Sequence, residues 1–241
     1  MKSIFHSHAL KVAAVTCALL LGQTVTAQDS NISALLHTEN PPTVQPLPIH
    51  GMIFAEKQGR VKIASGNGRF IFNGVMHDRW AGRDVLTLDD AIRAFNYIEM
   101  KGIGVDLVDA LKPYRYGAGK KDIVIFIDPY CSACSKLLTD MPVDSQKYTF
   151  NLIPIAVLGE ESKKRVKNLA CAKDQDAARL QLLTKQYRDL DEVETCSPDL
   201  MSYRMFTGQI LGIKGIPFMI RNDGLVSRGN PPLGVLAWLE G

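Results

Sequence analysis

The chain has 241 residues, 46% of them hydrophobic, and its 28 basic and 25 acidic side chains give a net charge of +3. This length allows one large domain or two small ones, and a charge so close to balance gives no basis for nucleic-acid binding. No segment approaches the roughly 20 consecutive apolar residues that a membrane-spanning helix needs.

Residues 1–27 have the organisation of a secretory signal peptide. Lysines precede the apolar stretch Val12–Leu21, which is too short to span a bilayer, and Ala27 suits cleavage. We therefore expect an exported protein whose mature chain is residues 28–241. Cys17 lies in the apolar stretch and is expected to leave with the peptide, so the mature chain keeps an even number of cysteines, as is typical of proteins with disulfides.

The start of the mature chain predicts an arm followed by a small β-rich domain. Residues 28–50 are polar and proline-rich, which favours an extended arm. Three β-like runs follow, separated by turn-forming residues, over Gly51–Glu56, Val61–Ala64 and Arg69–Phe72. Such a meander buries too little surface to be stable alone. We expect residues 28–84 to dock on another part of the protein or to dimerise.

A helical segment is expected over residues 85–112. Thr87 and Asp90 match a capping box, and apolar residues at helical spacing follow as far as Ile98. A second helical patch ends before Pro113. The segment is interpreted either as a helical linker between two domains or as the completion of the N-terminal domain.

Residues 113–241 are predicted to form a second, layered domain. The continuous apolar run 123–127 is typical of a central strand covered on both faces, and it leads directly into Cys131, Cys134 and a helix. The later elements are expected to be a strand over Tyr148–Leu158, a polar helical insertion over Glu160–Leu190, a helix over Pro198–Leu211, a strand over Ile216–Ile220 and a terminal helix near Leu233–Leu239. This order of strands and helices favours an α+β or α/β architecture of three layers.

Cys131 and Cys134 are the candidate catalytic residues. A free cysteine has a pKa near 8.5, and the first turn of a helix favours the thiolate through its unpaired N–H groups and its dipole. Cys131 is therefore predicted to be the nucleophile. Cys134 lies on the same face of the helix, where its thiol can attack a mixed disulfide and release the substrate.

The same Cys-x-x-Cys spacing also serves zinc sites and structural bridges. A zinc site needs further ligands nearby, whereas Cys171 and Cys196 are far apart in the sequence. A structural bridge seldom lies at a strand-to-helix turn with one sulfur at a helix start. We expect no metal and no cofactor.

The chain resembles the periplasmic thiol-disulfide interchange proteins of the DsbC/DsbG family within the thioredoxin superfamily, and the DsbC branch most. The resemblance covers essentially the whole mature chain. Its most specific stretches are Asp128–Leu138, Asn168–Asp174, Thr195–Cys196 and Leu211–Pro217.

The resemblance implies a thioredoxin fold with a helical insertion, preceded by a dimerisation domain and a linker, in a periplasmic protein. It implies a cis-proline at Pro217, with Ile216 beside it binding the substrate backbone, and a structural disulfide between Cys171 and Cys196. The implied partners are exported cysteine-containing proteins, a second copy of the chain and a membrane-bound thiol reductant like DsbD.

Two places depart from the DsbC pattern. Ser132 and Ala133 stand where DsbC has Gly-Tyr, and Ile216 stands where it has Thr. The strand acid of thioredoxin is also absent, because Ile125 occupies its place, while Asp128 and Tyr130 lie closer to the site. Isomerase, reductase and oxidase activities therefore all stay open. Two further hypotheses are a dimeric chaperone whose thiols are secondary and a periplasmic metal-handling protein.

Overall fold

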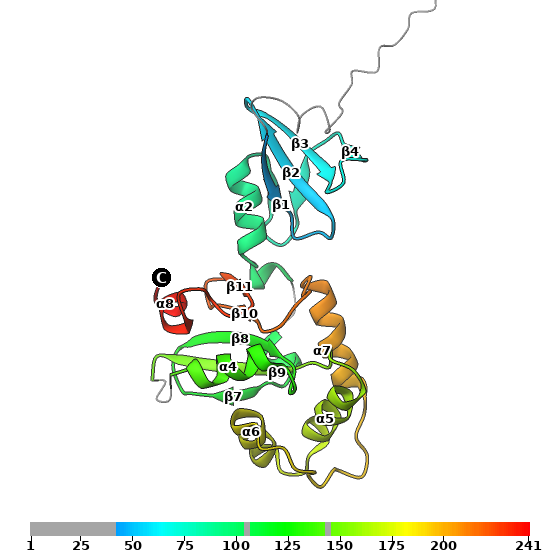
Figure 1. Cartoon of the computed structure of the whole chain (residues 1–241), viewed down its shortest axis with the longest axis vertical. Helices are drawn as coiled ribbons and strands as arrows, with labels where there is room; N and C mark the ends of the chain where they lie inside the picture. The colour runs from blue at the N-terminus through cyan, green and yellow to red at the C-terminus, as the bar shows by residue number, and fades with distance from the viewer. Residues whose placement is uncertain (1–41, 104–106, 143–145) are drawn as a thin grey trace, which may run out of the picture.

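The computed structural model describes residues 42–103, 107–142 and 146–241. The predicted signal peptide and almost all of the predicted arm before position 42 lie outside these residues. Figure 1 shows an N-terminal part, in which a helix lies against a sheet, followed by a C-terminal part built on a second sheet. Within the described ranges, no helix is both long enough and apolar enough to cross a bilayer.

The N-terminal part is a four-stranded antiparallel sheet with the strand order β1-β2-β3-β4. Its strands are β1 (Thr43–Pro46), β2 (Met52–Lys57), β3 (Arg60–Ser65) and β4 (Ile71–Phe72). The β2–β3 turn holds Gln58 and Gly59 at φ angles of 52° and 73°, as a two-residue hairpin turn of the primed type requires. The predicted meander is confirmed in β2, β3 and β4.

Strand β1 corrects the prediction of an extended arm over residues 28–50. Thr43 pairs with Glu56 and Val44 with Ala55, so this stretch forms an edge of the sheet. An edge strand tolerates a proline at its end, which is where Pro46 lies. The prolines therefore did not exclude a strand there.

Helix α2 (Leu88–Asn96) packs on this sheet and begins at the predicted capping box. The Thr87 hydroxyl accepts from the Asp90 N–H at 3.2 Å, and the Asp90 carboxylate accepts from the Thr87 N–H at 3.0 Å. A hairpin of β5 (Met76–Asp78) and β6 (Arg83–Val85) precedes the helix. The core of this part consists of Leu47, Phe54, Ile63, Val85 and Ala91. Because α2 supplies part of that core, it completes the N-terminal part, the second of the two interpretations.

The connection to the C-terminal part is anchored by two arginines. Its described elements are the 3-10 helix η1 (Met100–Ile103) and the short helix α3 (Leu107–Ala110). The buried Arg204 guanidinium donates to the carbonyls of Leu111 and Lys112, at 2.9 and 2.7 Å, and burial lowers its pKa to about 10. Arg228 donates to the Phe95 carbonyl at 2.6 Å and lies 4.0 Å from the centre of the Phe95 ring.

The C-terminal part is a five-stranded mixed sheet with the strand order β11-β10-β8-β9-β7. Its strands are β7 (Tyr114–Tyr116), β8 (Lys121–Ile127), β9 (Tyr148–Pro154), β10 (Phe218–Ile220) and β11 (Val226–Arg228). β8 and β9 are parallel, and the other pairs are antiparallel. A parallel pair joined through a helix, flanked by an antiparallel hairpin, is the arrangement of the predicted thioredoxin fold.

Helices cover both faces of this sheet, which gives the predicted three layers (Figure 1). They are α4 (Ser132–Asp140), α5 (Glu160–Cys171), α6 (Gln175–Thr184), α7 (Asp199–Ile210) and α8 (Val235–Glu240). Ile123 and Ile125 face a core with α4, α6 and α8, whereas Val124 and Phe126 face one with the connection and residues of α7. The run 123–127 is therefore buried on both faces, as predicted.

Three details of the C-terminal part differ from the predictions. Strand β7 was not predicted, and β9 ends at Pro154 rather than Leu158. It ends early because the N–H groups of Val157 and Leu158 bond to a buried carboxylate instead of a neighbouring strand. The insertion is helical in α5 and α6 but not after Lys185.

Candidate active site

Cys131 and Cys134 lie where β8 meets α4, and they form a disulfide with their Cα atoms 5.2 Å apart. Cys131 is the N-cap of α4, and the Cys134 N–H points at its sulfur at 3.0 Å. Once the disulfide is reduced, this N–H group and the helix dipole favour a thiolate on Cys131. Cys131 is 7% exposed and Cys134 is completely buried, so Cys131 is the sulfur that an incoming group reaches first.

The turn before Cys131 is held by the buried carboxylate of Asp128. One oxygen accepts the Tyr130 N–H at 2.9 Å. The other accepts the N–H groups of Val157 and Leu158 at 2.8 and 3.1 Å, and the Ser162 hydroxyl. Asp128 therefore joins the active-site turn to the loop between β9 and α5.

The carbonyl oxygen of Pro129, in the same turn, accepts hydrogen bonds from two side chains of the insertion. The Lys185 ammonium donates to it at 2.6 Å and the Tyr187 hydroxyl at 3.3 Å. The Tyr187 ring also meets the Tyr130 ring edge-on, with 5.9 Å between centroids. Burial lowers the pKa of Lys185 and raises that of Tyr187.

Pro217 stands beside the cysteines immediately before β10, and the Ile216–Pro217 peptide bond is cis. The Ile216 carbonyl oxygen lies 3.8 Å from the Cys131 sulfur. The Pro217 carbonyl accepts the Gly229 N–H at 2.8 Å. The structure thus brings the two predicted substrate-binding residues together with Cys131.

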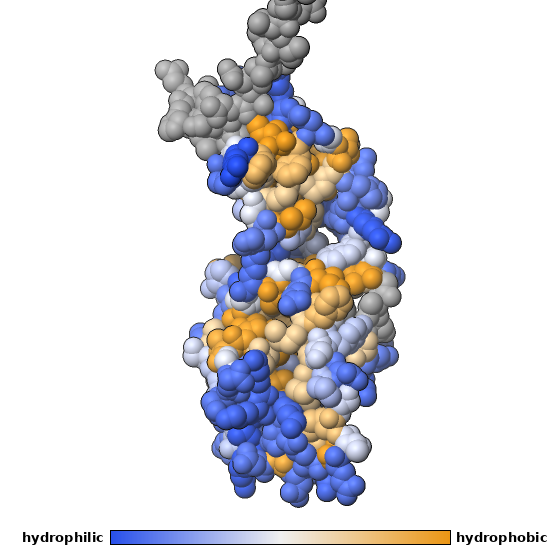
Figure 2. Space-filling view, turned by 90° about the vertical axis from the view of Figure 1, so that its right-hand side faces the viewer, coloured by the Kyte–Doolittle hydropathy of each residue, from blue (hydrophilic) through white to orange (hydrophobic). Residues whose placement is uncertain are grey.

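Ile216 also lines a cavity of about 540 Å³ between the N-terminal and C-terminal parts. Its walls include Pro48, Ile49, Phe95, Leu211, Phe218 and Arg228. Figure 2 shows hydrophobic side chains gathered on the N-terminal part and again on the C-terminal part below it. The walls of this cavity therefore run from Ile216, the residue before the cis-proline, to Met52 and Ile53 of the N-terminal sheet.

Sequence reasoning missed four residues of this site: Ser162, Lys185, Tyr187 and Asn230. Asn230 follows β11 and its amide donates to the Ala133 carbonyl, between the two cysteines, at 3.0 Å. None of the four belongs to a local pattern, because each reaches the site from a distant segment. The turn residues Asp128 and Tyr130 did carry a signal, because they lie close to Cys131 in the sequence.

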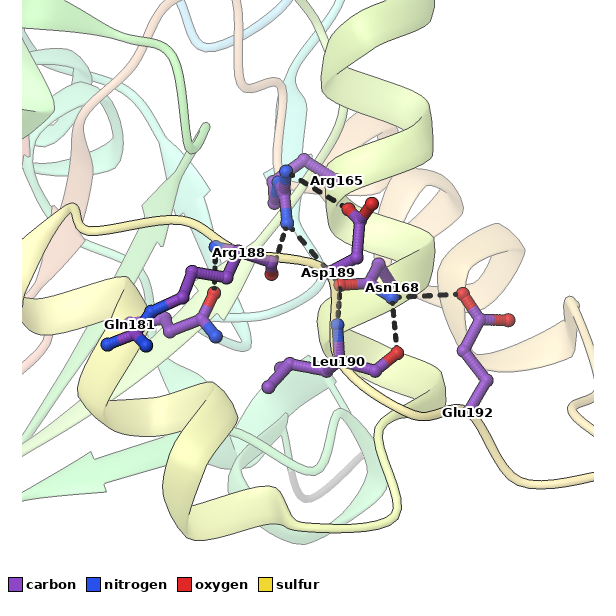
Figure 3. Close-up of polar contacts among 7 residues, drawn as sticks. All are labelled: Arg165, Asn168, Gln181, Arg188, Asp189, Leu190 and Glu192. Carbon is purple, nitrogen blue, oxygen red and sulfur yellow. Dashed lines mark hydrogen bonds and ion pairs between the residues drawn. The ribbon is translucent and has the colours of Figure 1, made fainter.

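Cys171 and Cys196 form a second disulfide away from this turn, with their Cα atoms 5.5 Å apart. Cys171 is the last residue of α5, and Cys196 precedes α7. The segment 188–192 between them is further tied to α5 and α6 by polar contacts (Figure 3). The bridge thus closes the insertion and does not contribute a sulfur to the first pair.

The site can perform thiol-disulfide exchange, because Cys131 and Cys134 form a disulfide and Cys131 lies at the N-terminus of α4. Within the part of the chain that the structure describes, no three His, Cys, Asp or Glu side chains gather in a way that could hold a metal ion.

No protein-family model and no curated protein matches the chain. Solved structures similar to it include a disulfide interchange protein from Neisseria gonorrhoeae, 20% identical, covering 52% of this chain and 89% of that one with a TM-score of 0.43. Proteus mirabilis ScsC in a transitional conformation is 19% identical, over 54% and 70% of the two chains, with a TM-score of 0.43. Helicobacter pylori DsbG is 18% identical, over 80% and 100%, with a TM-score of 0.35. With identities of 20% or less and TM-scores below 0.5, these similarities do not establish the activity of this chain.

Proposed function

We propose that the protein is a periplasmic thiol-disulfide oxidoreductase of the DsbC/DsbG type that acts on the disulfides of exported proteins. The observation that carries this proposal is the position of Cys131 at the N-cap of α4, with its sulfur facing the Cys134 N–H and the Ile216 carbonyl. These contacts supply a stabilised thiolate, a resolving thiol and a backbone edge for the substrate. The similar solved structures include a disulfide interchange protein.

The proposed reaction begins with the reduced dithiol. The Cys131 thiolate attacks one sulfur of a substrate disulfide, so that a mixed disulfide forms and the other substrate sulfur leaves as a thiolate, which takes up a proton only when reduction follows. In isomerisation, that thiolate attacks elsewhere in the substrate, and a substrate thiol finally displaces Cys131. In reduction, the deprotonated thiol of Cys134 attacks Cys131, the substrate leaves as a dithiol and the protein keeps the disulfide.

Repeated reduction requires two electrons per cycle from an external thiol reductant. We propose a membrane-bound protein of the DsbD kind for this role, because the signal peptide predicts an exported chain and the site itself holds no other source of electrons among its described residues. Isomerisation consumes no electrons overall, but it needs Cys131 to be kept reduced.

Isomerisation is the activity we favour, and the N-terminal part supports it. Val61, Phe72, Val75 and Leu86 are each between 37% and 64% exposed. They line a surface hollow of about 400 Å³. We propose that this apolar patch joins two copies of the chain. Two Cys131 sites would then share one substrate, and the second contact would gain from a high effective concentration.

The first experiment measures the reduction of insulin and the reactivation of scrambled ribonuclease by the full mature chain. Cys131→Ala should abolish both activities. If Cys131→Ala retains either activity while Cys134→Ala loses it, the assignment of the nucleophile is wrong.

The second experiment tests the dimer. Phe72→Lys should convert a dimer to a monomer in sedimentation, retain insulin reduction and lose most reactivation of scrambled ribonuclease. Phe206→Lys is the matched control, because Phe206 is 56% exposed but lies on α7, and it should change neither property. A wild-type chain that sediments as a monomer would leave a thioredoxin-like reductase as the better description.

A chaperone activity is the second candidate, and the apolar cavity beside Ile216 favours it. A protein lacking both active-site thiols distinguishes the two. Cys131→Ala/Cys134→Ala should lose insulin reduction. If this variant still suppresses the aggregation of an unfolded protein as well as the wild type does, binding is independent of the thiols.

A further inference from the structure

Helix α6 of the insertion packs in the same core as α4, and the chain after it contacts the active-site turn through Lys185 and Tyr187. Lys185 is the C-cap of α6 and has a φ angle of 60°, so the chain turns sharply there. Its ammonium lies 2.6 Å from the Pro129 carbonyl oxygen, two residues before Cys131. The insertion therefore places a cation next to the turn that carries the nucleophile.

Hydrogen bonds between side chains and backbone hold the segment that follows Lys185. The Arg188 N–H bonds to the Gln181 side chain at 2.9 Å, and the Arg165 guanidinium bonds to the Arg188 carbonyl at 2.8 Å. Asn168 both donates to and accepts from the backbone of Leu190, at 3.0 and 3.1 Å. Figure 3 shows these contacts converging from α5 and α6 on one stretch of chain. Lys185 is thus held at Pro129 and is unlike a free surface lysine.

The charges around the turn give Lys185 a second effect. Asp128 is completely buried, and among the described residues its hydrogen-bond donors are the N–H groups of Tyr130, Val157 and Leu158 and the Ser162 hydroxyl, all of them neutral. A buried carboxylate close to Cys131 opposes a second negative charge on the sulfur. Lys185 interacts favourably with Asp128, so it offsets that repulsion.

The other titratable groups facing the turn are Tyr130, Tyr187 and Arg165. Burial raises the pKa of Tyr187, so its hydroxyl stays neutral at physiological pH. The Arg165 guanidinium lies over the Tyr187 ring at 5.2 Å and is also paired with Asp189 at 3.6 Å. Lys185 is the cation that touches the turn itself.

We propose that Lys185 is a positioning residue for Cys131: its ammonium fixes the Pro129 carbonyl and offsets the Asp128 carboxylate, which favours the Cys131 thiolate. This inference rests on the proposed function, because it takes Cys131 as the nucleophile. If it is correct, the insertion contributes to the reactivity of Cys131 as well as to the fold.

The test replaces Lys185 and titrates the Cys131 thiol of the reduced protein through its thiolate absorbance near 240 nm. Lys185→Met removes the charge but keeps a similar stem, and Lys185→Asn removes it with a residue suited to the left-handed backbone. Both should raise the thiol pKa, and the rate of alkylation at a pH below that pKa should fall roughly threefold to tenfold. The equilibrium with glutathione should shift towards the oxidised protein by a similar factor, because the thiolate belongs to the reduced form.

Three controls accompany these variants. Lys185→Arg keeps the charge and should restore most of the wild-type pKa. Tyr187→Phe removes a donor to Pro129 but no charge, and should shift the pKa much less than Lys185→Met. Lys173→Met removes the same charge just before the N-cap of α6, beyond the far end of a ten-residue helix about 15 Å long, and should change nothing.

The inference is overturned if Lys185→Met and Lys185→Asn leave a low wild-type thiol pKa unchanged. It is also overturned if Tyr187→Phe or Lys173→Met shifts the pKa as far. A wild-type Cys131 with an ordinary thiol pKa would instead overturn the proposed function. The titration needs no turnover, so it separates these two failures, and a melting curve of each variant shows that the folded protein is being titrated.

Discussion

The side-chain amide of Asn230 donates a hydrogen bond to the carbonyl oxygen of Ala133 at 3.0 Å, which ties the loop after β11 to the dipeptide between the cysteines. The Asn230 Oδ1 atom is buried and has no hydrogen-bond partner among the described residues. Asn230→Ala removes this hydrogen bond, but it also removes the unpaired acceptor, whose burial is unfavourable. We therefore expect the free energy of unfolding to fall by only about 1 kcal/mol. Asn230→Asp should cost more, because a carboxylate would face the same carbonyl. Urea unfolding of the oxidised protein measures both, and a reversed order would contradict this account.

Of the polar residues in the turn, Asp128 should lower the free energy of unfolding most when it is replaced. Asp128→Asn leaves a single acceptor oxygen and turns an NH₂ group towards backbone N–H donors. We expect the free energy of unfolding to fall by about 2–4 kcal/mol. Asp140→Asn is the control, because its ion pair with Lys136 is on the surface and should contribute less than about 1 kcal/mol. Equal losses in the two variants would show that the buried contacts of Asp128 do not stabilise the fold.

The Cys171–Cys196 bridge should act on stability and not on chemistry. The two residues are 25 positions apart, and the chain-entropy estimate for such a loop is about 3–4 kcal/mol. Cys171→Ser/Cys196→Ser should lower the melting temperature, while insulin reduction well below the transition keeps its rate, because polar contacts still hold segment 188–192 (Figure 3). Loss of activity at unchanged stability would assign this pair a redox role.

Tyr114 should make the free energy of unfolding depend on pH in the alkaline range. Its hydroxyl donates to the Leu169 carbonyl at 2.7 Å, and burial raises its pKa to about 12, whereas an unfolded tyrosine titrates near 10. The folded state thus keeps a proton that the unfolded state loses between pH 10 and 12, so this residue's contribution is present below pH 10 and fades as the pH rises to 12.

The matched variant for that effect is Tyr114→Phe, which lacks both the hydrogen bond and the titration. It should be less stable than the wild type at pH 8, and the gap should close by about 1 kcal/mol per pH unit above pH 10. Burial depresses the pKa of Arg204 in both proteins, while Tyr114 raises it, so the gap reports the titration of Tyr114 together with its interaction with Arg204. Urea midpoints of the oxidised proteins between pH 8 and 11.5 provide the measurement. A gap that stays constant would mean that Tyr114 titrates normally.

The sequence predicted those features whose physical causes are local. The capping box at Thr87, the run 123–127 and the position of Cys131 at a helix start each depend on neighbours within a few residues, so they could be recognised without the fold. The short strands β1 and β7 were missed because three or four residues at a sheet edge carry no alternation long enough to recognise.

The supports of the active-site turn could not be predicted, because they depend on contacts between distant segments. Lys185 is 56 residues from Pro129, and Asn230 is 97 residues from Ala133. No periodicity or spacing relates such positions, and the residue types are ordinary for an insertion and a loop. Only the register of the sheet and the path of the insertion bring them to the cysteines.

Both outer strands of the five-stranded sheet, β7 and β11, have only three residues. An edge this short offers few unpaired N–H and C=O groups to a strand of another molecule. A protein that handles unfolded chains, as we propose, repeatedly meets segments prone to cross-β assembly. Its brief edges would give such segments little template to pair with, so we expect the protein itself to resist joining their aggregates.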